Sequence, residues 1–144
     1  MLMQVEPATT TPRTAYPELL ERVRRAGAYA DVERAEQVVG DVLAGLGRQL
    51  TGEERGELAA LLPAEAAQLL VAEVPDIRPL TGWGFVKDLA TRTGGTLART
   101  RWDVGSVLRV VADLADRDLL DRILAQLRPG YALLFGRAEL VQPA

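Results

Sequence analysis

The chain has 144 residues, a formal net charge of −3 and 48% hydrophobic residues, an ordinary composition for one globular domain. It contains no cysteine and no histidine, which excludes disulfides, thiolate nucleophiles, imidazole metal ligands and histidine-dependent catalytic triads. The acidic balance also disfavours a protein dedicated to binding the phosphate backbone of nucleic acids.

Residues 1–14 are polar and rich in proline and threonine, without the basic and apolar regions of a secretory signal, and they predict a disordered lead. No apolar run elsewhere reaches the about eighteen residues that span a membrane. The sequence therefore predicts a cytoplasmic protein that meets no membrane. It also predicts no bound metal and no other cofactor.

A first helical half is expected over residues 15–73. Pro17 suits a first helical turn, because the N–H that proline lacks has no partner there, and Gly27 suits the end of that helix. Asp31 is placed to cap a second helix over about residues 32–48. Apolar residues recur through that helix with helical spacing, which predicts one buried face.

The same half is expected to hold two shorter helices. Thr51 and Glu54 have the spacing of a capping box, in which each side chain accepts a free N–H at the start of a third helix. Pro63 ends that helix and opens a short fourth one through about Val71. Residues 74–81 contain two prolines and predict a linker.

Residues 82–136 repeat this pattern at an offset of 65 or 66 residues. The matching positions are Leu19 with Phe85, Leu20 with Val86, Val23 with Leu89, Gly40 with Gly105, Val42 with Val107, Leu43 with Leu108, Leu46 with Val111, Leu58 with Leu124 and Pro63 with Pro129. Asp116 takes the capping place of Thr51. We therefore predict an all-α protein of about eight helices, built as a tandem repeat in one bundle-like domain, with a tail over residues 137–144.

Three glycines, Gly40, Gly45 and Gly47, fall inside the expected second helix, where each costs up to about 1 kcal/mol relative to alanine. They could let a partner or ligand approach the backbone, or they could serve close packing within the core. Because Gly105 occupies the place of Gly40 in the second half, shared packing is the favoured interpretation.

Five segments stand out for their packing and capping residues: LAGL at 43–46, QLTGEE at 49–54, LAALLP at 58–63, AQLRP at 125–129 and LLF at 133–135. Together they resemble an uncharacterised bacterial family, the domain of unknown function DUF2267. The first half has Leu61 where the family usually has glutamine, and the second half has Arg128 where the family usually has leucine. The resemblance implies a small all-helical protein and supplies no catalytic residue.

We interpret the chain as a non-enzymatic protein-interaction module that forms either a homodimer or one subunit of a larger assembly. The short fourth and eighth helices are expected to expose the docking surface, formed by Leu69, Leu70, Leu133, Leu134 and Phe135. The halves also differ in charge, since residues 16–70 hold ten acids and six bases and residues 82–135 hold six acids and eight bases. This asymmetry permits attraction between the halves or between copies of the chain.

Two alternatives stay open. Arg92, Arg99 and Arg101 could contact an anion or a nucleic acid beside Trp102, although Trp102 is more easily explained as a core residue. A pocket between the halves near Trp83 and Trp102 could instead carry a small molecule. A group of aspartates around residues 113–121 lacks calcium-loop spacing and is expected to cap a helix and to pair with Arg117 and Arg122.

Overall fold

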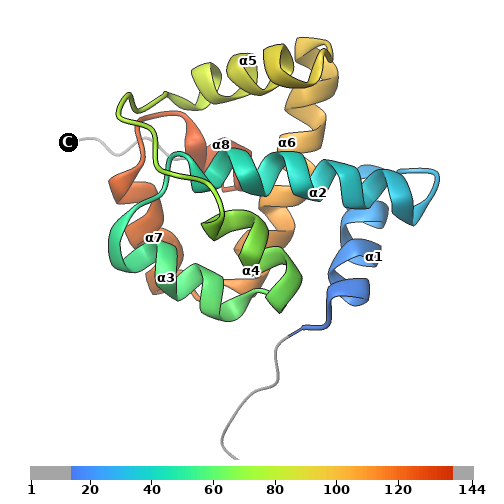
Figure 1. Cartoon of the computed structure of the whole chain (residues 1–144), viewed down its shortest axis with the longest axis horizontal. Helices are drawn as coiled ribbons and strands as arrows, with labels where there is room; N and C mark the ends of the chain where they lie inside the picture. The colour runs from blue at the N-terminus through green and yellow to red at the C-terminus, as the bar shows by residue number, and fades with distance from the viewer. Residues whose placement is uncertain (1–13, 138–144) are drawn as a thin grey trace, which may run out of the picture.

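Two long helices, α2 (Val32–Gly47) and α6 (Leu97–Leu114), pack on one another at the centre of the fold, and the shorter helices surround them (Figure 1). The structure, a computed structural model, describes residues 14–137. The shorter helices are α1 (Tyr16–Gly27), α3 (Gly52–Leu61), α4 (Ala64–Val71), α5 (Gly82–Thr93), α7 (Arg117–Gln126) and α8 (Tyr131–Leu134). The predicted lead and most of the predicted tail lie outside the described residues.

One hydrophobic core joins the two halves. Its buried residues come from every helix, and the faces of α2 and α6 supply the largest share. Between residues 14 and 137 there are eight helices and no strand, so the predicted all-α class and helix number are confirmed. Helix lengths also run in parallel, with 12 residues in both α1 and α5 and 10 in both α3 and α7. The duplication itself stays a prediction.

The predicted caps at Asp31 and Asp116 are confirmed. The Asp31 carboxylate accepts the N–H of Arg34 at 2.9 Å, and the Asp116 carboxylate accepts the N–H of Leu119 at 2.8 Å. Each therefore satisfies one of the N–H groups that a helix start leaves without a partner.

The end of α1 differs from the expected glycine cap. Ala28, and not Gly27, adopts the left-handed conformation, with φ of 54°. Gly27 is required for a different reason, because a Cβ at this position would lie 2.2 Å from the ring of Tyr29. The glycine thus allows the tyrosine to fold back over the helix end, where its ring is buried.

The linker over residues 74–81 is tied to the end of α2. The N–H of Asp76 donates to the carbonyl of Arg48 at 2.7 Å, and the N–H of Leu80 donates to the Gln49 side chain at 2.8 Å. Farther along, the Tyr131 hydroxyl donates to the Leu80 carbonyl at 3.1 Å. The linker is therefore held by both halves.

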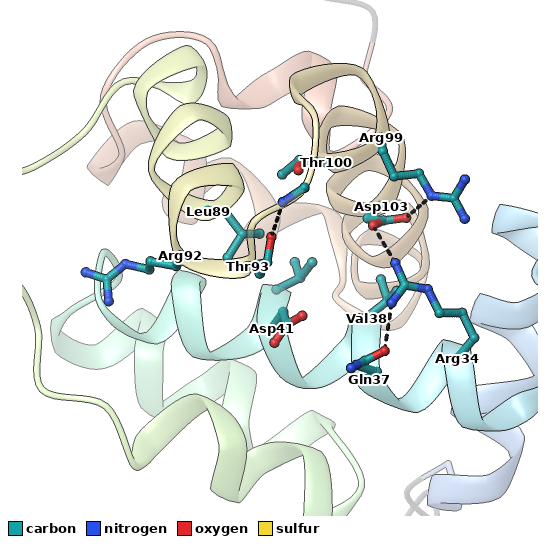
Figure 2. Close-up of a pocket in the computed structure, with 12 residues that line it drawn as sticks. Arg34, Gln37, Val38, Asp41, Leu89, Arg92, Thr93, Arg99, Thr100 and Asp103 are labelled. Atoms are coloured by element: carbon teal, nitrogen blue, oxygen red, sulfur yellow. Dashed lines mark hydrogen bonds and ion pairs between the residues drawn. The ribbon is translucent and has the colours of Figure 1, made fainter.

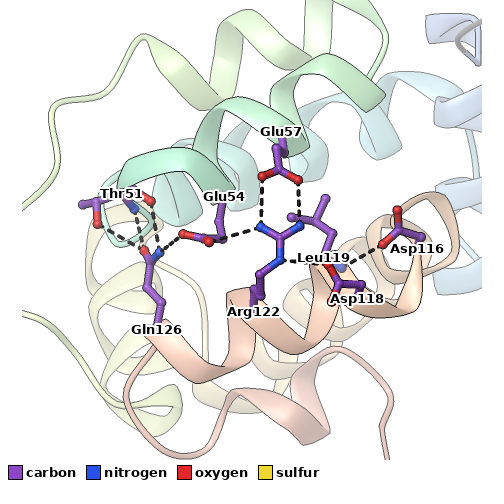
Figure 3. Close-up of polar contacts among 8 residues, drawn as sticks. All are labelled: Thr51, Glu54, Glu57, Asp116, Asp118, Leu119, Arg122 and Gln126. Atoms are coloured by element: carbon purple, nitrogen blue, oxygen red, sulfur yellow. Dashed lines mark hydrogen bonds and ion pairs between the residues drawn. The ribbon is translucent and has the colours of Figure 1, made fainter.

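The predicted capping box at Thr51 and Glu54 is wrong, because both residues serve the contact between α3 and α7 (Figure 3). The N–H of Thr51 donates to Gln126 Oε1 at 2.6 Å, and Gln126 Nε2 donates to the Thr51 carbonyl at 3.0 Å. The Glu54 carboxylate accepts from Gln126 Nε2 at 2.9 Å. A side chain from the second half thus replaces the local cap.

Arg122 completes this contact between the halves (Figure 3). Its guanidinium forms two parallel hydrogen bonds with Glu57, at 2.9 and 2.8 Å, and donates to Glu54 at 3.2 Å. The remaining Nε–H donates to Asp118 of its own helix at 3.0 Å. The hydrogen bond from Arg122 lowers the pKa of the Glu57 carboxyl. Two acids of the first half, Glu54 and Glu57, therefore pair with a base of the second half, Arg122, as the charge asymmetry permits.

The favoured interpretation of the glycines holds at two of the four positions. Gly45 and Gly47 approach Phe85 and the Leu70 carbonyl closely, but no heavy atom lies within 4 Å of a Cβ built on Gly40. Gly105 lies beneath Arg101 and not beneath another helix. Shared packing at Gly40 and Gly105 is therefore wrong, because nothing packs on Gly40 and only arginine side chains of α6 itself lie over Gly105.

Candidate functional site

The predicted docking surface is largely buried. Leu70, Leu134 and Phe135 belong to the core, and Leu69 is half-buried against it. Only Leu133 is exposed, to 61%. The expectation of exposure is wrong because α4 packs on α2 and α8 packs on α6, so these short helices turn their apolar faces inward.

The three arginines of the predicted anion site are exposed but do not act as one group. Arg92 pairs with Asp88 at 2.8 Å, and Arg99 lies 3.6 Å from Asp103. Both line a cleft between α2, α5 and α6, whereas Arg101 lies outside that cleft. The structure therefore brings together two of the three.

Neither tryptophan forms the predicted pocket. Trp102 is 49% exposed, so its expected place in the core is wrong, and its indole N–H donates to the Gly27 carbonyl at 2.9 Å. Trp83, at the start of α5, is 56% exposed. A pocket between the halves does exist, but other residues line it.

That pocket is the cleft between α2 of the first half and α5 and α6 of the second (Figure 2). Its volume is about 290 Å³. One wall is a face of α2, and the opposite wall comes from the end of α5, the turn after it and the start of α6. The turn at Gly94 is an ordinary helix end, with φ of 78° and its N–H bonded to Ala90. The lining residues are Arg34, Gln37, Val38, Asp41, Val42, Leu89, Arg92, Thr93, Gly95, Arg99, Thr100 and Asp103.

The two carboxylates of the cleft have opposite surroundings. Asp103 accepts the Tyr29 hydroxyl at 2.6 Å and lies 3.5 Å from Arg34 Nη2, and its side chain is only 13% exposed. Burial and the bond to Asp103 both raise the pKa of the Tyr29 hydroxyl. Asp103 thus serves the packing of α1 against α6.

Asp41, in contrast, has no hydrogen-bond or ion-pair partner among residues 14–137. Figure 2 shows its carboxylate facing the open part of the cleft, below Thr93 and Leu89. Burial raises the pKa of this carboxyl above its usual value, and the charge of Arg34 partly offsets that effect. Asp41 does not stand out in the sequence, because an isolated acid on a helix is usually solvated.

Replacing Asp41 by asparagine is expected to raise the free energy of unfolding by roughly 0.5 kcal/mol at neutral pH. Since the pKa is higher in the folded than in the unfolded protein, ionisation of Asp41 costs stability above the folded pKa. The stability gained by the asparagine variant should shrink as the pH falls through the folded pKa. It should vanish below the unfolded pKa, where the Asp41 carboxyl is neutral in both the folded and the unfolded protein. Urea unfolding at neutral and acidic pH measures this difference in stability. An asparagine variant that is less stable than the wild type at neutral pH would contradict the prediction.

The unpaired charges separate between the halves. Of the ten acids in residues 16–70, only Glu21, Glu54 and Glu57 form ion pairs with described bases. In residues 82–135 every acid is paired except Asp116, which caps α7. Five second-half bases have no ion pair within the described part of the chain: Lys87, Arg101, Arg109, Arg117 and Arg128.

The aspartates around residues 113–121 have structural partners. Arg122 pairs with Asp118 as predicted, but Arg117 does not pair with any of them. Asp113 pairs with Arg22, and Asp121 pairs with Arg137, so Arg137 is not part of a frayed tail. No group of acids between residues 14 and 137 is arranged to hold a metal ion.

In the described part of the chain, no helix combines the length and the apolar character that crossing a membrane requires. No curated protein matches the sequence. A family model does match it, over residues 16–134, and this family is described as an uncharacterized conserved protein. Because the match covers all eight helices, the chain belongs to the DUF2267 family.

Proposed function

We propose that this chain is a non-enzymatic interaction module of the cytoplasm that associates with other copies of itself through opposite charges. The segregation of unpaired acids and bases between its halves carries the proposal. Charges that already form ion pairs within one molecule contribute little to binding a second molecule. Unpaired charges of opposite sign on two surfaces attract each other.

The acidic surface centres on Tyr16 and consists of Glu33, Glu36 and Glu65. The Tyr16 hydroxyl donates to Glu36 at 3.4 Å. Burial, and then the negative charges of Glu36 and Glu65, raise the pKa of this hydroxyl. Glu65 lies on α4, which contacts α1. Glu33 lies one turn before Glu36 on α2, on the same face. We call these three glutamates the acidic face.

The basic surface lies on α6. A Cβ on Gly105 would lie 2.9 Å from Arg101 Nη1 and 3.7 Å from Arg109 Nη1, so two guanidinium groups converge over this glycine. Both arginines are exposed and lack an ion pair with any described acid. We call this pair the basic stripe. Two convergent guanidinium groups suit carboxylates of a second molecule.

The association is expected to weaken with salt, because exposed charges are screened over about 8–10 Å at physiological ionic strength. Light scattering at about 0.05 M and about 0.5 M NaCl should show a larger species only at the lower salt. Reversing the acidic face (Glu33→Lys with Glu36→Lys) or the basic stripe (Arg101→Glu with Arg109→Glu) should weaken self-association at least about tenfold.

Mixing the two reversed variants gives the decisive result, because each then carries the charge that the other lost. The mixture should associate although neither variant associates alone. Glu53→Lys with Arg117→Glu, which alters unpaired charges outside both surfaces, is the matched control and should behave as the wild type. A wild-type protein that is strictly monomeric at low salt, or a mixture that stays monomeric, would overturn the proposal.

The basic stripe also favours a second candidate, because Trp102, the residue after Arg101 on α6, is half-exposed. Arginine next to an accessible aromatic ring can grip single-stranded nucleic acid. Binding of a labelled oligonucleotide should then fall steeply with salt and be lost in the Arg101→Glu and Arg109→Glu variant. No binding at low salt would eliminate this candidate.

A further inference from the structure

One wall of the cleft carries two opposite charges. Arg34 and Asp41 are seven residues apart in α2, which is about two turns, so their side chains share one face about 10 Å apart along the axis. Val38 lies between them on the same face. This spacing suits a ligand with a positive group at one end and a negative group at the other.

Asp41 is the acceptor for the positive end. It has no partner among the described residues, and its carboxylate faces the cleft (Figure 2). Ion pairing with a ligand ammonium would offset the desolvation that this carboxylate already bears. The other cleft carboxylate, Asp103, is already bonded to Tyr29 and has little capacity left.

Arg34 is the donor for the negative end. Its Nη1 donates to Gln37 at 2.7 Å, and its Nη2 lies 3.5 Å from Asp103. A guanidinium has five N–H donors in a planar fork, so others remain for a ligand carboxylate. The bond to Gln37 also holds the guanidinium beside the cleft.

Between the charged ends the cleft is small, and its volume of about 290 Å³ is at the lower limit for sites that bind small molecules. The buried side chains of Val38, Val42 and Leu89 line it together with the polar residues Gln37, Thr93 and Thr100. An extended peptide spans about 3.3–3.6 Å per residue, so two or three residues reach across the distance between Asp41 and Arg34.

We propose that the cleft binds a short peptide of two or three residues, with its terminal ammonium on Asp41 and its terminal carboxylate on Arg34. The lining of the cleft includes no residue of the acidic face or of the basic stripe, so peptide binding and self-association are tested with different variants.

Titration calorimetry with the tripeptide Leu-Gly-Gly tests this assignment. The wild type should bind it, and Asp41→Asn or Arg34→Gln should each weaken binding at least about tenfold. Arg34→Lys keeps the charge but not the fork, so it should lose less than Arg34→Gln. Glu53→Gln, outside the cleft, should bind as the wild type does. Thermal melts of all variants separate lost binding from lost folding.

Blocked peptides identify which end carries the affinity. Acetylation of the amino end should abolish the contribution of Asp41, so that the acetylated peptide binds the wild type and Asp41→Asn equally weakly. Amidation of the carboxyl end should do the same for Arg34. The assignment is overturned if the acetylated and free peptides bind equally well, which would show an anion site only. It is also overturned if the wild type shows no binding of the free peptide at about 10 mM, a Kd worth only about 2.7 kcal/mol of binding free energy.

Discussion

Replacing Arg55 by leucine should lower the free energy of unfolding by about 2–4 kcal/mol. Arg55 pairs with no carboxylate of a described residue. Its guanidinium instead donates to five backbone carbonyl groups, which belong to Gly47, Leu50, Leu70, Val71 and Glu73. The substitution would therefore remove the hydrogen bonds that Arg55 donates at the ends of two helices, α2 and α4.

Two physical effects add at this position. The last carbonyls of a helix have no N–H partner within it, and the ends of α2 and α4 both turn theirs toward Arg55. Nη2 donates to the Glu73 carbonyl at 2.5 Å, and Nη1 donates to the Leu50 carbonyl at 2.9 Å. A positive charge at a helix C-terminus is also favoured by the helix dipole, and here one charge serves two helices.

Two variants make this expectation specific. Lysine keeps the charge but has three donors and no planar fork, so Arg55→Lys should lose about half as much as Arg55→Leu. Arg25→Leu is the matched control, since Arg25 is an exposed arginine in the last turn of α1 with a surface ion pair to Glu21. It should cost no more than about 0.5 kcal/mol. Urea unfolding followed by circular dichroism measures all three, and a loss below about 1 kcal/mol for Arg55→Leu would refute the role.

The helices could be predicted from the sequence because their determinants are local. Apolar spacing, the capping aspartates Asp31 and Asp116, and the positions of Pro17 and Pro63 act within a few residues. The structure places helices at these positions. Predictions that depended on distant partners were less successful. Thr51 has the sequence of a local cap, but Gln126, 75 residues away, occupies its N–H.

The same limit explains the errors at the predicted surfaces. Leu70 and Phe135 were expected to be exposed because their helices are short, and nothing local shows that α2 and α6 cover them. Trp102 was expected in the core, but its indole reaches the Gly27 carbonyl from a half-exposed position.

The cleft could not be predicted for a related reason. Arg34 and Asp41 are ordinary charged residues of an amphipathic helix. They line a cleft only because α5 and α6 pack opposite this face of α2. The charge asymmetry was visible in the sequence. Which charges remain unmatched depends on ion pairs between the halves, such as Arg22 with Asp113 and Arg122 with Glu57, that only the folded chain brings together.

Gly47→Ala should be the second strongly destabilising change, with a loss of about 2–3 kcal/mol. A Cβ at Gly47 would lie 2.0 Å from the Leu70 carbonyl oxygen and 3.0 Å from its carbon. Both atoms are backbone, so no side chain can rotate aside, and α2 and α4 would have to separate at their closest approach. Gly40→Ala, in the same helix, meets no heavy atom within 4 Å. It should instead stabilise the protein by up to about 1 kcal/mol, because alanine favours the helix.

The opposite signs of these two substitutions separate close packing from helix propensity, because both replace a glycine inside α2 by the same residue. Gly47→Ala should also couple to Arg55→Leu. The alanine displaces the Leu70 carbonyl, which is one of the acceptors of Arg55, so the double variant should lose less than the sum of the two single losses. Additive losses in the double variant would show that Gly47 and Arg55 do not act on the same contact between the ends of α2 and α4. Stability changes of equal sign for Gly40→Ala and Gly47→Ala would show that close packing does not set the effect at Gly47.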